Sequence, residues 1–303
     1  MTKKKNLIIF GGTGFIGYHL AKKILQKGWN ITCVSSKSPK KSRRLSKVKY
    51  LRCDVRDNKK LKKIIKKKYS HVVNLSGYVD HSNKTKTYQS HYIGCKNIAK
   101  IFLKFRPTSF VQMGSSLEYG KVTSPQKESA KSKPISNYAR SKFLSTKYLL
   151  SIYRKENFPV TILRLYQAYG PGQDLNRLIP IVINSCLKKE KFPCSEGKQY
   201  RDFIHVSDVT NAIFKTLTNP KARGHIINIG SGKAINIKSL IKKIVNLARG
   251  GIPQYGKIKL RKEESLKIFP SILKAKKILK WQPKVNLDRG LISTIKKYSE
   301  KKK

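Results

Sequence analysis

The chain has 303 residues, enough for one large or two modest domains around a hydrophobic core. It carries 68 Lys and Arg against 15 Asp and Glu, a formal net charge of +53, but the lysines are spread through nearly every segment and no nucleic-acid-binding motif accompanies them. We therefore interpret most of this charge as solvated surface and expect no specific nucleic acid partner. Binding of a polyanion is the alternative.

The cysteines and the apolar runs indicate the cellular compartment in which the protein works. The five cysteines (Cys33, Cys53, Cys95, Cys186 and Cys194) are scattered and odd in number, which fits free thiols in a reducing compartment better than disulfides or a zinc site. The apolar run at residues 7–10 is too short for a signal peptide, and no stretch approaches the length of a membrane span. We expect a cytoplasmic protein.

The first element is a buried parallel strand at residues 7–10, followed by a glycine-rich turn and an amphipathic helix to about residue 27. The turn contains Gly11, Thr13, Gly14, Phe15, Ile16 and Gly17. Glycines at this spacing let the backbone turn sharply and approach a pyrophosphate, while the helix N-terminus attracts the phosphates. The segment predicts a dinucleotide-binding site.

The second strand, residues 30–34, ends at Ser35, Ser36 and Lys37, with further basic residues at 40, 41, 43 and 44. NAD-binding folds usually have a carboxylate here that accepts hydrogen bonds from the ribose 2′-hydroxyl. A carboxylate would repel a 2′-phosphate, whereas hydroxyls and cations would bind one, so the sequence favours NADP over NAD. An ordinary basic loop is the alternative.

Strands and helices then alternate through residue 165. We expect strands at 48–53, 71–75, 110–113 and 160–165, and helices at 58–68, 85–105 and 138–156. The third strand ends at Asp54 and Val55, a site for the adenine end of the cofactor. We interpret His81 and His91 as ordinary polar residues because no second ligand stands at metal spacing. The pattern predicts an α/β fold with a doubly wound parallel sheet.

Glycine and proline at 170–172 interrupt this alternation, and we place a lobe boundary there. Residues 1–165 would form the cofactor-binding Rossmann domain, and residues 166–303 a smaller, mainly substrate-binding lobe. In the second part we expect helices at 177–186 and 207–218, two helical pieces between 271 and 297, and one more strand, at 225–229, that rejoins the first sheet.

Tyr138 and Lys142 are four residues apart on a predicted helix, so they share one face. The ammonium can then lie beside the phenol and favour the phenolate, which gives a proton donor usable near neutral pH. Ser115 follows an apolar run and Gly114, at the carboxyl end of a strand, where ligands of open α/β sheets bind. A solvated helix face is the alternative for the Tyr–Lys pair taken alone.

With these motifs in order, the chain resembles the extended short-chain dehydrogenase/reductase family, the NAD-dependent epimerase/dehydratase group that acts on nucleotide-linked sugars. The resemblance covers nearly the whole length. It is carried by segments 11–17, 115–120, 138–142, 164–171, 200–206, 228–232 and 281–283, together with Asp54.

The resemblance implies roles for particular residues. Ser115 would bond the reacting oxygen of the sugar, Tyr138 would transfer the proton, and Lys142 would hold the nicotinamide ribose. The implied cofactor-binding residues are those of the glycine turn, Ser35, Ser36, Lys37, Asp54, Val55, Leu75, Tyr138 and Lys142. The implied substrate-binding residues are Ser116, Gln167, Arg201 and Arg261; for Arg201, an ion pair with Asp202 or another carboxylate is the alternative to phosphate contact.

The reaction is less closely defined. Related 4,6-dehydratases have an acidic residue at the position of Leu117, often with another at Ser116, and Glu118 on an extended chain would point the opposite way. The absence of those acids argues against a dehydratase. Between an epimerase that retains NAD and a 4-ketoreductase that consumes NADPH, the Ser35–Lys37 segment favours the reductase. Segment 113–120 is also similar to those of 4-ketoreductases that make 6-deoxyhexoses.

Two departures from the family pattern are Gln167 and His91, where asparagine is usual; the first puts the identity of the substrate in doubt. A non-catalytic nucleotide- or RNA-binding protein is the alternative outside the enzymes. By resemblance alone we also expect a homodimer, paired through the helices at 85–105 and 138–156.

Overall fold

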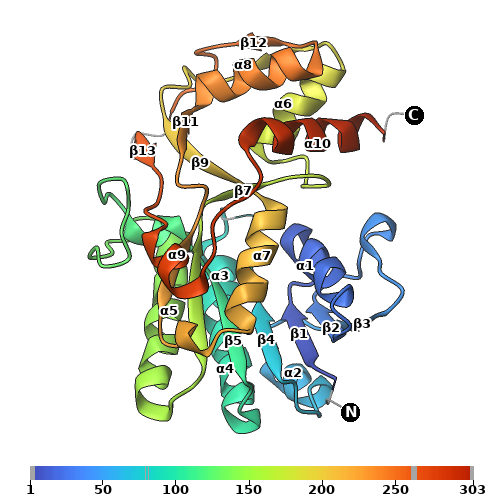
Figure 1. Cartoon of the computed structure of the whole chain (residues 1–303), viewed down its shortest axis with the longest axis vertical. Helices are drawn as coiled ribbons and strands as arrows, with labels where there is room; N and C mark the ends of the chain where they lie inside the picture. Colours follow the sequence, from blue (N-terminus) through green and yellow to red (C-terminus); the bar gives the residue numbers. More distant parts are fainter. Residues whose placement is uncertain (1–3, 79, 81, 261–264, 301–303) are drawn as a thin grey trace.

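The computed structural model describes residues 4–78, 80, 82–260 and 265–300. Its largest element is a parallel sheet with the strand order β10-β6-β5-β4-β1-β2-β3 (Figure 1). The strands are β1 (Asn6–Phe10), β2 (Asn30–Ser35), β3 (Val48–Arg52), β4 (His71–Asn74), β5 (Ser109–Ser115), β6 (Val160–Leu165) and β10 (Ile226–Ile229). The central strands are almost continuously buried because both faces of the sheet are covered.

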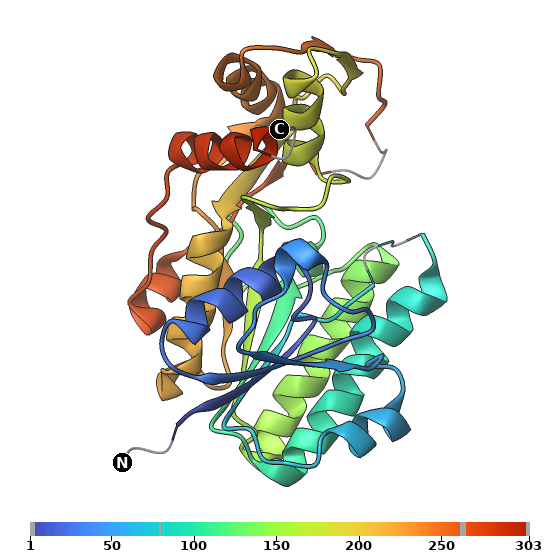
Figure 2. The same cartoon turned by 90° about the vertical axis from the view of Figure 1, so that its right-hand side faces the viewer.

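Helices cover both faces of this sheet, as Figure 2 shows. One face carries α1 (Phe15–Leu25), α7 (Val206–Leu217) and α9 (Leu273–Leu279), and the other carries α2 (Asn58–Ile64), α4 (Gly94–Phe105) and α5 (Asn137–Glu156). Each set packs on its own hydrophobic core, with Leu20 and Ile213 in the first and Phe102 and Leu149 in the second. The predicted doubly wound parallel sheet is confirmed.

A smaller layer lies beyond the carboxyl ends of the large sheet (Figure 1). Its strands are β7 (Gln167–Tyr169), β9 (Tyr200–His205), β11 (Ala234–Asn236) and β13 (Lys267–Ile268), with β8 (Lys191–Pro193) paired separately to β12 (Ile252–Gln254). The helices α6 (Leu178–Leu187), α8 (Ile237–Ala248) and α10 (Leu287–Ser299) share a third core with Tyr169 and Phe203.

The expectation of a single strand after residue 165 is wrong. Besides β10, the described residues there form six short strands, β7, β8, β9, β11, β12 and β13, and the additional helix α8. Most of these strands have only two or three residues, too few to show a period of two. The strand expected at 225–229 does lie in the large sheet, with Ile226 paired to Ile162. The division at residue 165 remains a prediction.

Two predicted helices differ in extent. The helix predicted at 58–68 ends at Ile64, and the one predicted at 85–105 is divided into α3 (Lys84–Tyr88), a π turn (Gln89–Ile93) and α4. All five cysteines are buried free thiols. In the described part of the chain, no helix combines the length and apolarity needed to cross a bilayer.

Candidate active site

The glycine turn is shaped by close backbone contacts. Gly11 has a φ of +77°, and a Cβ there would lie 2.9 Å from the carbonyl carbon of Leu75 on the neighbouring strand. A Cβ on Gly12 would lie 2.4 Å from Cys33 Sγ, and one on Gly17 would lie 2.4 Å from Gly11 O. These glycines therefore leave no room for side chains, and they let helix α1 begin directly behind β1.

Helix α1 begins at Phe15 with Gly14 as its N-cap, and no side chain caps its first turn. The first backbone N–H groups of a helix have no partner within the helix, and they attract anions. Thr13 sits at the tip of the turn, where its backbone N–H donates a 3.3 Å hydrogen bond to Ser35 Oγ. The turn thus has the open backbone and helix terminus that a dinucleotide pyrophosphate requires.

The end of β2 lies beside this turn. Ser36 and Lys37 are exposed, and Arg52 Nε donates to the Ser36 carbonyl oxygen. Among the other cations of this loop, Arg43 donates 2.7 and 2.9 Å hydrogen bonds to Gly172 O and Asp174 Oδ1, while Lys40 lies 3.4 Å from the same carboxylate oxygen. Lys37 is therefore exposed, whereas Lys40 and Arg43 contact the segment after β7.

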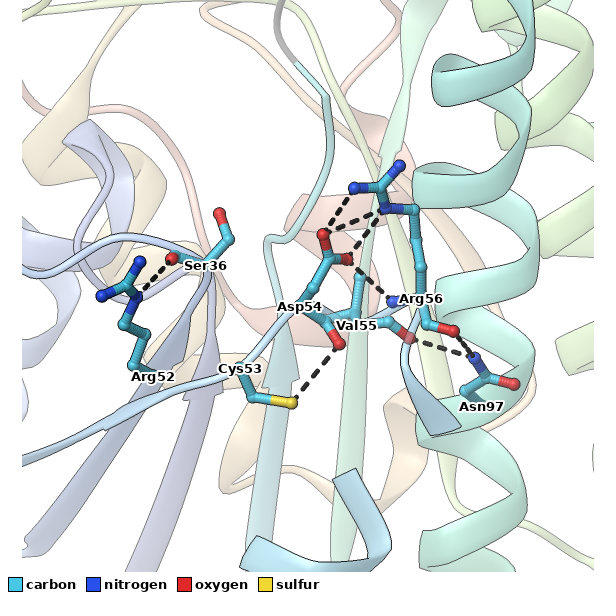
Figure 3. A network of polar contacts seen from close by, with 7 residues as sticks. All are labelled: Ser36, Arg52, Cys53, Asp54, Val55, Arg56 and Asn97. Carbon is cyan, nitrogen blue, oxygen red and sulfur yellow. Dashed lines mark hydrogen bonds and ion pairs between the residues drawn. The ribbon is translucent and has the colours of Figure 1, made fainter. Parts of the chain in front are cut away.

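The end of β3 carries a second polar group (Figure 3). Both carboxylate oxygens of Asp54 accept hydrogen bonds from Arg56, at 2.7–3.0 Å, and these bonds hold the pKa of Asp54 below its ordinary value. Asn97 on α4 donates to the carbonyl oxygens of Val55 and Arg56. A hollow of about 440 Å³ opens here, lined by Asp54, Arg56 and Ile93 among others.

Lys142 lies close to Tyr138 and to the carboxyl end of β5, where Ser115 stands. Lys142 is 5% exposed, and its ammonium donates a 2.8 Å hydrogen bond to the carbonyl oxygen of Met113, two residues before Ser115. The same ammonium lies 6.0 Å from the ring centroid of Tyr138. Tyr138 stands in the first turn of α5, which Ser136 caps by accepting a hydrogen bond from Ala139 N.

Ser115 ends β5 and caps a 3-10 turn at Ser116–Tyr119. Its hydroxyl oxygen accepts a 3.2 Å hydrogen bond from Leu117 N, which leaves its proton available for donation to a ligand. Its own backbone N–H donates a 2.8 Å hydrogen bond to Glu118 Oε1. The turn therefore holds the hydroxyl in position and leaves its proton free to be donated.

Glu118 is fully buried. The expectation of extended backbone at this position is wrong, because residues 116–119 form a 3-10 turn. In this turn Glu118 Oε2 accepts a hydrogen bond from Thr146 on α5 and lies 3.1 Å from the guanidinium of Arg164, whose side chain is 2% exposed. That guanidinium stacks over the ring of Tyr119 at 4.2 Å. The carboxylate holds the turn against the sheet and is already engaged by these partners.

His91 contributes more than the sequence indicated. Its ring lies edge-on to Tyr138, with centroids 4.9 Å apart, and its Nε2 is 3.1 Å from the carbonyl oxygen of Tyr78. The π turn places it there, and its backbone carbonyl accepts a hydrogen bond from Ser145 on α5. The only signal in the sequence was its position three residues before Gly94.

The predicted substrate residues lie in different settings. Ser116 is buried in the 3-10 turn, and Gln167 is exposed at the start of β7. Arg201 on β9 is 7% exposed and donates to the carbonyl oxygens of Tyr200 and Leu266. The neighbouring Asp202 accepts hydrogen bonds from the Ser231–Lys233 turn. Arg261 lies outside the described residues.

The donor groups at this edge suit a dinucleotide rather than a metal. Within the described ranges, no three His, Cys, Asp or Glu side chains gather as a metal site. The glycine turn, the uncapped helix α1 and the hollow after β3 follow one another along the carboxyl edge, at the ends of adjacent strands. Fold and site together define a dinucleotide-binding α/β protein with a buried lysine, Lys142, beside Tyr138.

Comparisons with known proteins agree with this class. Residues 7–230 match the model of the NAD dependent epimerase/dehydratase family. The chain is 28% identical to the UDP-N-acetyl-alpha-D-glucosaminuronate decarboxylase of Bacillus cytotoxicus over 98% of both chains, and 22% identical to the UDP-glucose 4-epimerase of Rhizobium meliloti over 94% of both. The solved UDP-glucose 4-epimerase of Thermotoga maritima, with UDP-glucose, superposes with a TM-score of 0.92 at 23% identity, covering 98% of this chain and 100% of that one.

The chain belongs to the NAD dependent epimerase/dehydratase family. It is therefore an enzyme that works with a nicotinamide dinucleotide, and the resemblance inferred from its motifs is confirmed.

Proposed function

We propose that this protein is an NADP-dependent oxidoreductase that reduces the 4-keto group of a nucleotide-diphosphate 6-deoxy sugar. The names of its relatives support the substrate class, since they describe an epimerase and a decarboxylase of nucleotide sugars. Residues 1–165 would bind the dinucleotide and residues 166–303 would mainly bind the sugar nucleotide, which would lie between the two layers. Arg201, Gln167 and Ser116 are the proposed contacts to it.

The observation that carries the proposal is the buried ammonium of Lys142 beside Tyr138, anchored on Met113 O two residues from Ser115. The dinucleotide, when bound, supplies a hydride. Ser115 donates a hydrogen bond from its hydroxyl to the ketone oxygen. Tyr138 transfers its phenolic proton to the same oxygen as the ketone is reduced to an alcohol. The charge of Lys142 stabilises the negative charge that this transfer leaves on the phenol oxygen.

The choice of NADP rests on the end of β2. Ser35 stands where a carboxylate would repel a 2′-phosphate, and its hydroxyl is instead used by Thr13 N. Ser36 and the exposed Lys37 follow, so the nearest side chains are hydroxyls and a cation. Of the other cations in this loop, Lys40 and Arg43 already contact Asp174, so Lys37 is the residue that we propose contacts the phosphate.

The geometry also bears on the alternatives. A 4,6-dehydratase requires an acid beside the sugar, but Leu117 occupies that position and Glu118 is held by Arg164 and Thr146. The second candidate is a 4-epimerase, which the name of the Rhizobium meliloti relative favours. An epimerase would return the hydride to the same carbon and would retain NAD through many turnovers.

The decisive experiment is to identify the dinucleotide and the reaction together. The purified enzyme is assayed with NADPH and UDP- or dTDP-4-keto-6-deoxyglucose, and separately for interconversion of UDP-glucose and UDP-galactose without added cofactor. Stoichiometric oxidation of NADPH supports the reductase, whereas interconversion with bound NAD establishes the epimerase. In either assay Tyr138→Phe should lower turnover by roughly 10²–10⁴-fold, as expected for a lost general acid.

A further inference from the structure

A second hollow, of about 460 Å³, lies between helix α7 and the segment that follows α9. The two helices lie side by side on one face of the large sheet (Figures 1 and 2). The far end of α7 is near the amino edge of the sheet, because Arg223 a few residues later donates a hydrogen bond to Thr108 O, just before β5. None of the residues that line the hollow belongs to the candidate active site around Ser115.

Four of the residues lining this hollow are lysines, Lys215, Lys276, Lys280 and Lys284. No ion pair in the described part of the chain involves any of them. Positive charges that line one hollow repel one another, and a bound anion relieves that repulsion.

One of these charges is fixed in place. The ammonium of Lys215 donates hydrogen bonds to the carbonyl oxygens of Lys280, at 2.7 Å, and Leu279, at 3.5 Å. Both acceptors are carbonyl groups at the carboxyl end of α9, so hydrogen bonds hold the ammonium there without a carboxylate partner. Asn219 strengthens the same junction by donating to Ile278 O. A ligand would meet a positive charge that is already positioned.

Trp281 forms one wall of the hollow. It is 2% exposed and its indole nitrogen is buried, so the ring closes the hollow and its N–H does not open into it. Lys280, in the left-handed conformation at φ +47°, turns the chain so that Trp281 and Gln282 line the hollow together.

We infer that this hollow binds a small, multiply charged phosphate compound, such as a pyrophosphate or a phosphomonoester. A ligand with two or more negative charges is needed to offset four ammonium groups, and lysines bind phosphate oxygens through charge-assisted hydrogen bonds. The Gln282 amide supplies a neutral donor to the remaining oxygens. The volume is in the range of small-molecule sites, roughly 300–1,000 Å³. The inference is independent of the reaction that the enzyme catalyses.

The test is calorimetric titration of the full-length protein with inorganic pyrophosphate at constant ionic strength. Lys276→Gln with Lys280→Gln removes two exposed charges of the hollow and spares Lys215. The matched control is Lys277→Gln with Lys296→Gln, which removes two exposed charges that do not line it. We expect the first variant to weaken binding by about tenfold or more, and the control to change it by less than about twofold.

Two further arms separate the sources of binding. Gln282→Leu removes the neutral amide donor of the hollow, and it should weaken pyrophosphate binding about threefold or more while the folded state is retained by circular dichroism. Unchanged affinity in the Lys276/Lys280 variant would place the anion in the dinucleotide site and overturn the inference. Equal losses of pyrophosphate affinity in both double variants would mean that the overall positive charge of the protein, and not the hollow, binds the anion, and would also overturn the inference. If a short oligouridylate bound more tightly than pyrophosphate, and the Lys276/Lys280 variant lost that binding, the ligand would be a nucleic acid and the inference of a small phosphate compound would be overturned.

Discussion

Two carboxylates follow the carboxyl ends of strands in the large sheet, and each pairs with an arginine in different surroundings. Glu118 after β5 and its partner Arg164 have side chains that are 0% and 2% exposed, whereas Asp54 after β3 and Arg56 are 35% and 37% exposed. The ion-pair distances are similar, 3.1 and 2.7 Å. Burial, rather than distance, distinguishes the two pairs.

The difference in burial suits the Glu118–Arg164 pair to supporting the fold and the Asp54–Arg56 pair to binding a ligand. Glu118 has further partners in Thr146 and the backbone of Ser115, so it fixes the turn that carries the hydroxyl of that serine. Asp54 is bonded chiefly within its own three-residue segment, beside a hollow. Water can replace the partners of a half-exposed pair at little cost, but not those of a buried one. The exposed pair can therefore rearrange around a ligand.

The largest effect is expected from Glu118→Ala. The substitution leaves the guanidinium of Arg164 buried without its counter-charge, which should lower the free energy of unfolding by about 3–5 kcal/mol. Urea denaturation followed by circular dichroism measures this loss. Adding Arg164→Met to the same chain removes the stranded charge and should recover part of the stability. A loss below about 1 kcal/mol in the single variant would remove the contrast between the two pairs.

A third carboxylate sharpens the comparison because it is buried but held by backbone N–H groups and a hydroxyl. Asp202 accepts hydrogen bonds from Ser231, Gly232 and Lys233, yet burial raises its pKa to about 6. The native state therefore binds a proton more readily than the unfolded chain, in which the pKa is near 4. Its contribution to stability should grow as the pH falls from about 6 to 4, by about 3 kcal/mol, and disappear as the pH rises through 6.

Urea denaturation of the wild type and of Asp202→Asn at pH 7, 6 and 5 measures this contribution, since titration of other groups affects both proteins alike. The advantage of the wild type should increase toward pH 5. An advantage that shrinks on acidification would mean that hydrogen bonds from N–H groups lower the pKa of a buried carboxylate as effectively as an arginine does.

Thr146→Val removes one bond from the Glu118 group while keeping the shape of the side chain. Because the lost hydrogen bond has a charged acceptor, we expect a destabilisation of about 2 kcal/mol in urea denaturation. Thr216→Val is the control: that buried hydroxyl donates to the neutral carbonyl of Ala212 in its own helix and should matter about half as much. Equal losses would show that the charge of Glu118 adds nothing to the bond.

The elements that the sequence predicted well are those whose signals are local. β1, the glycine turn and α1 follow one another directly, and Tyr138 and Lys142 are one helical turn apart, so spacing alone was enough. The pairing of Glu118 with Arg164, 46 residues away, depends on β5 and β6 being neighbours and leaves no local trace. Helix α8 was missed although Ile237, Leu240, Ile241 and Ile244 have helical spacing. The short strands gave no such signal.

The smallest effect on stability, and the one most informative about ligand binding, is expected from Asp54→Asn. Loss of a half-exposed ion pair should change the free energy of unfolding by less than about 1 kcal/mol. If this carboxylate accepts a hydrogen bond from the adenine end of the dinucleotide, the variant should bind the cofactor roughly three- to tenfold more weakly, as for one lost hydrogen bond. Asp288→Asn, which removes a similarly exposed pair with Lys243 on the smaller layer, is the control and should leave cofactor affinity unchanged. Fluorescence titration with NADPH and with NAD measures both variants. A strongly destabilised Asp54→Asn would mean that the exposed pair is structural like the buried one, and full cofactor affinity would mean that Asp54 does not contact the dinucleotide.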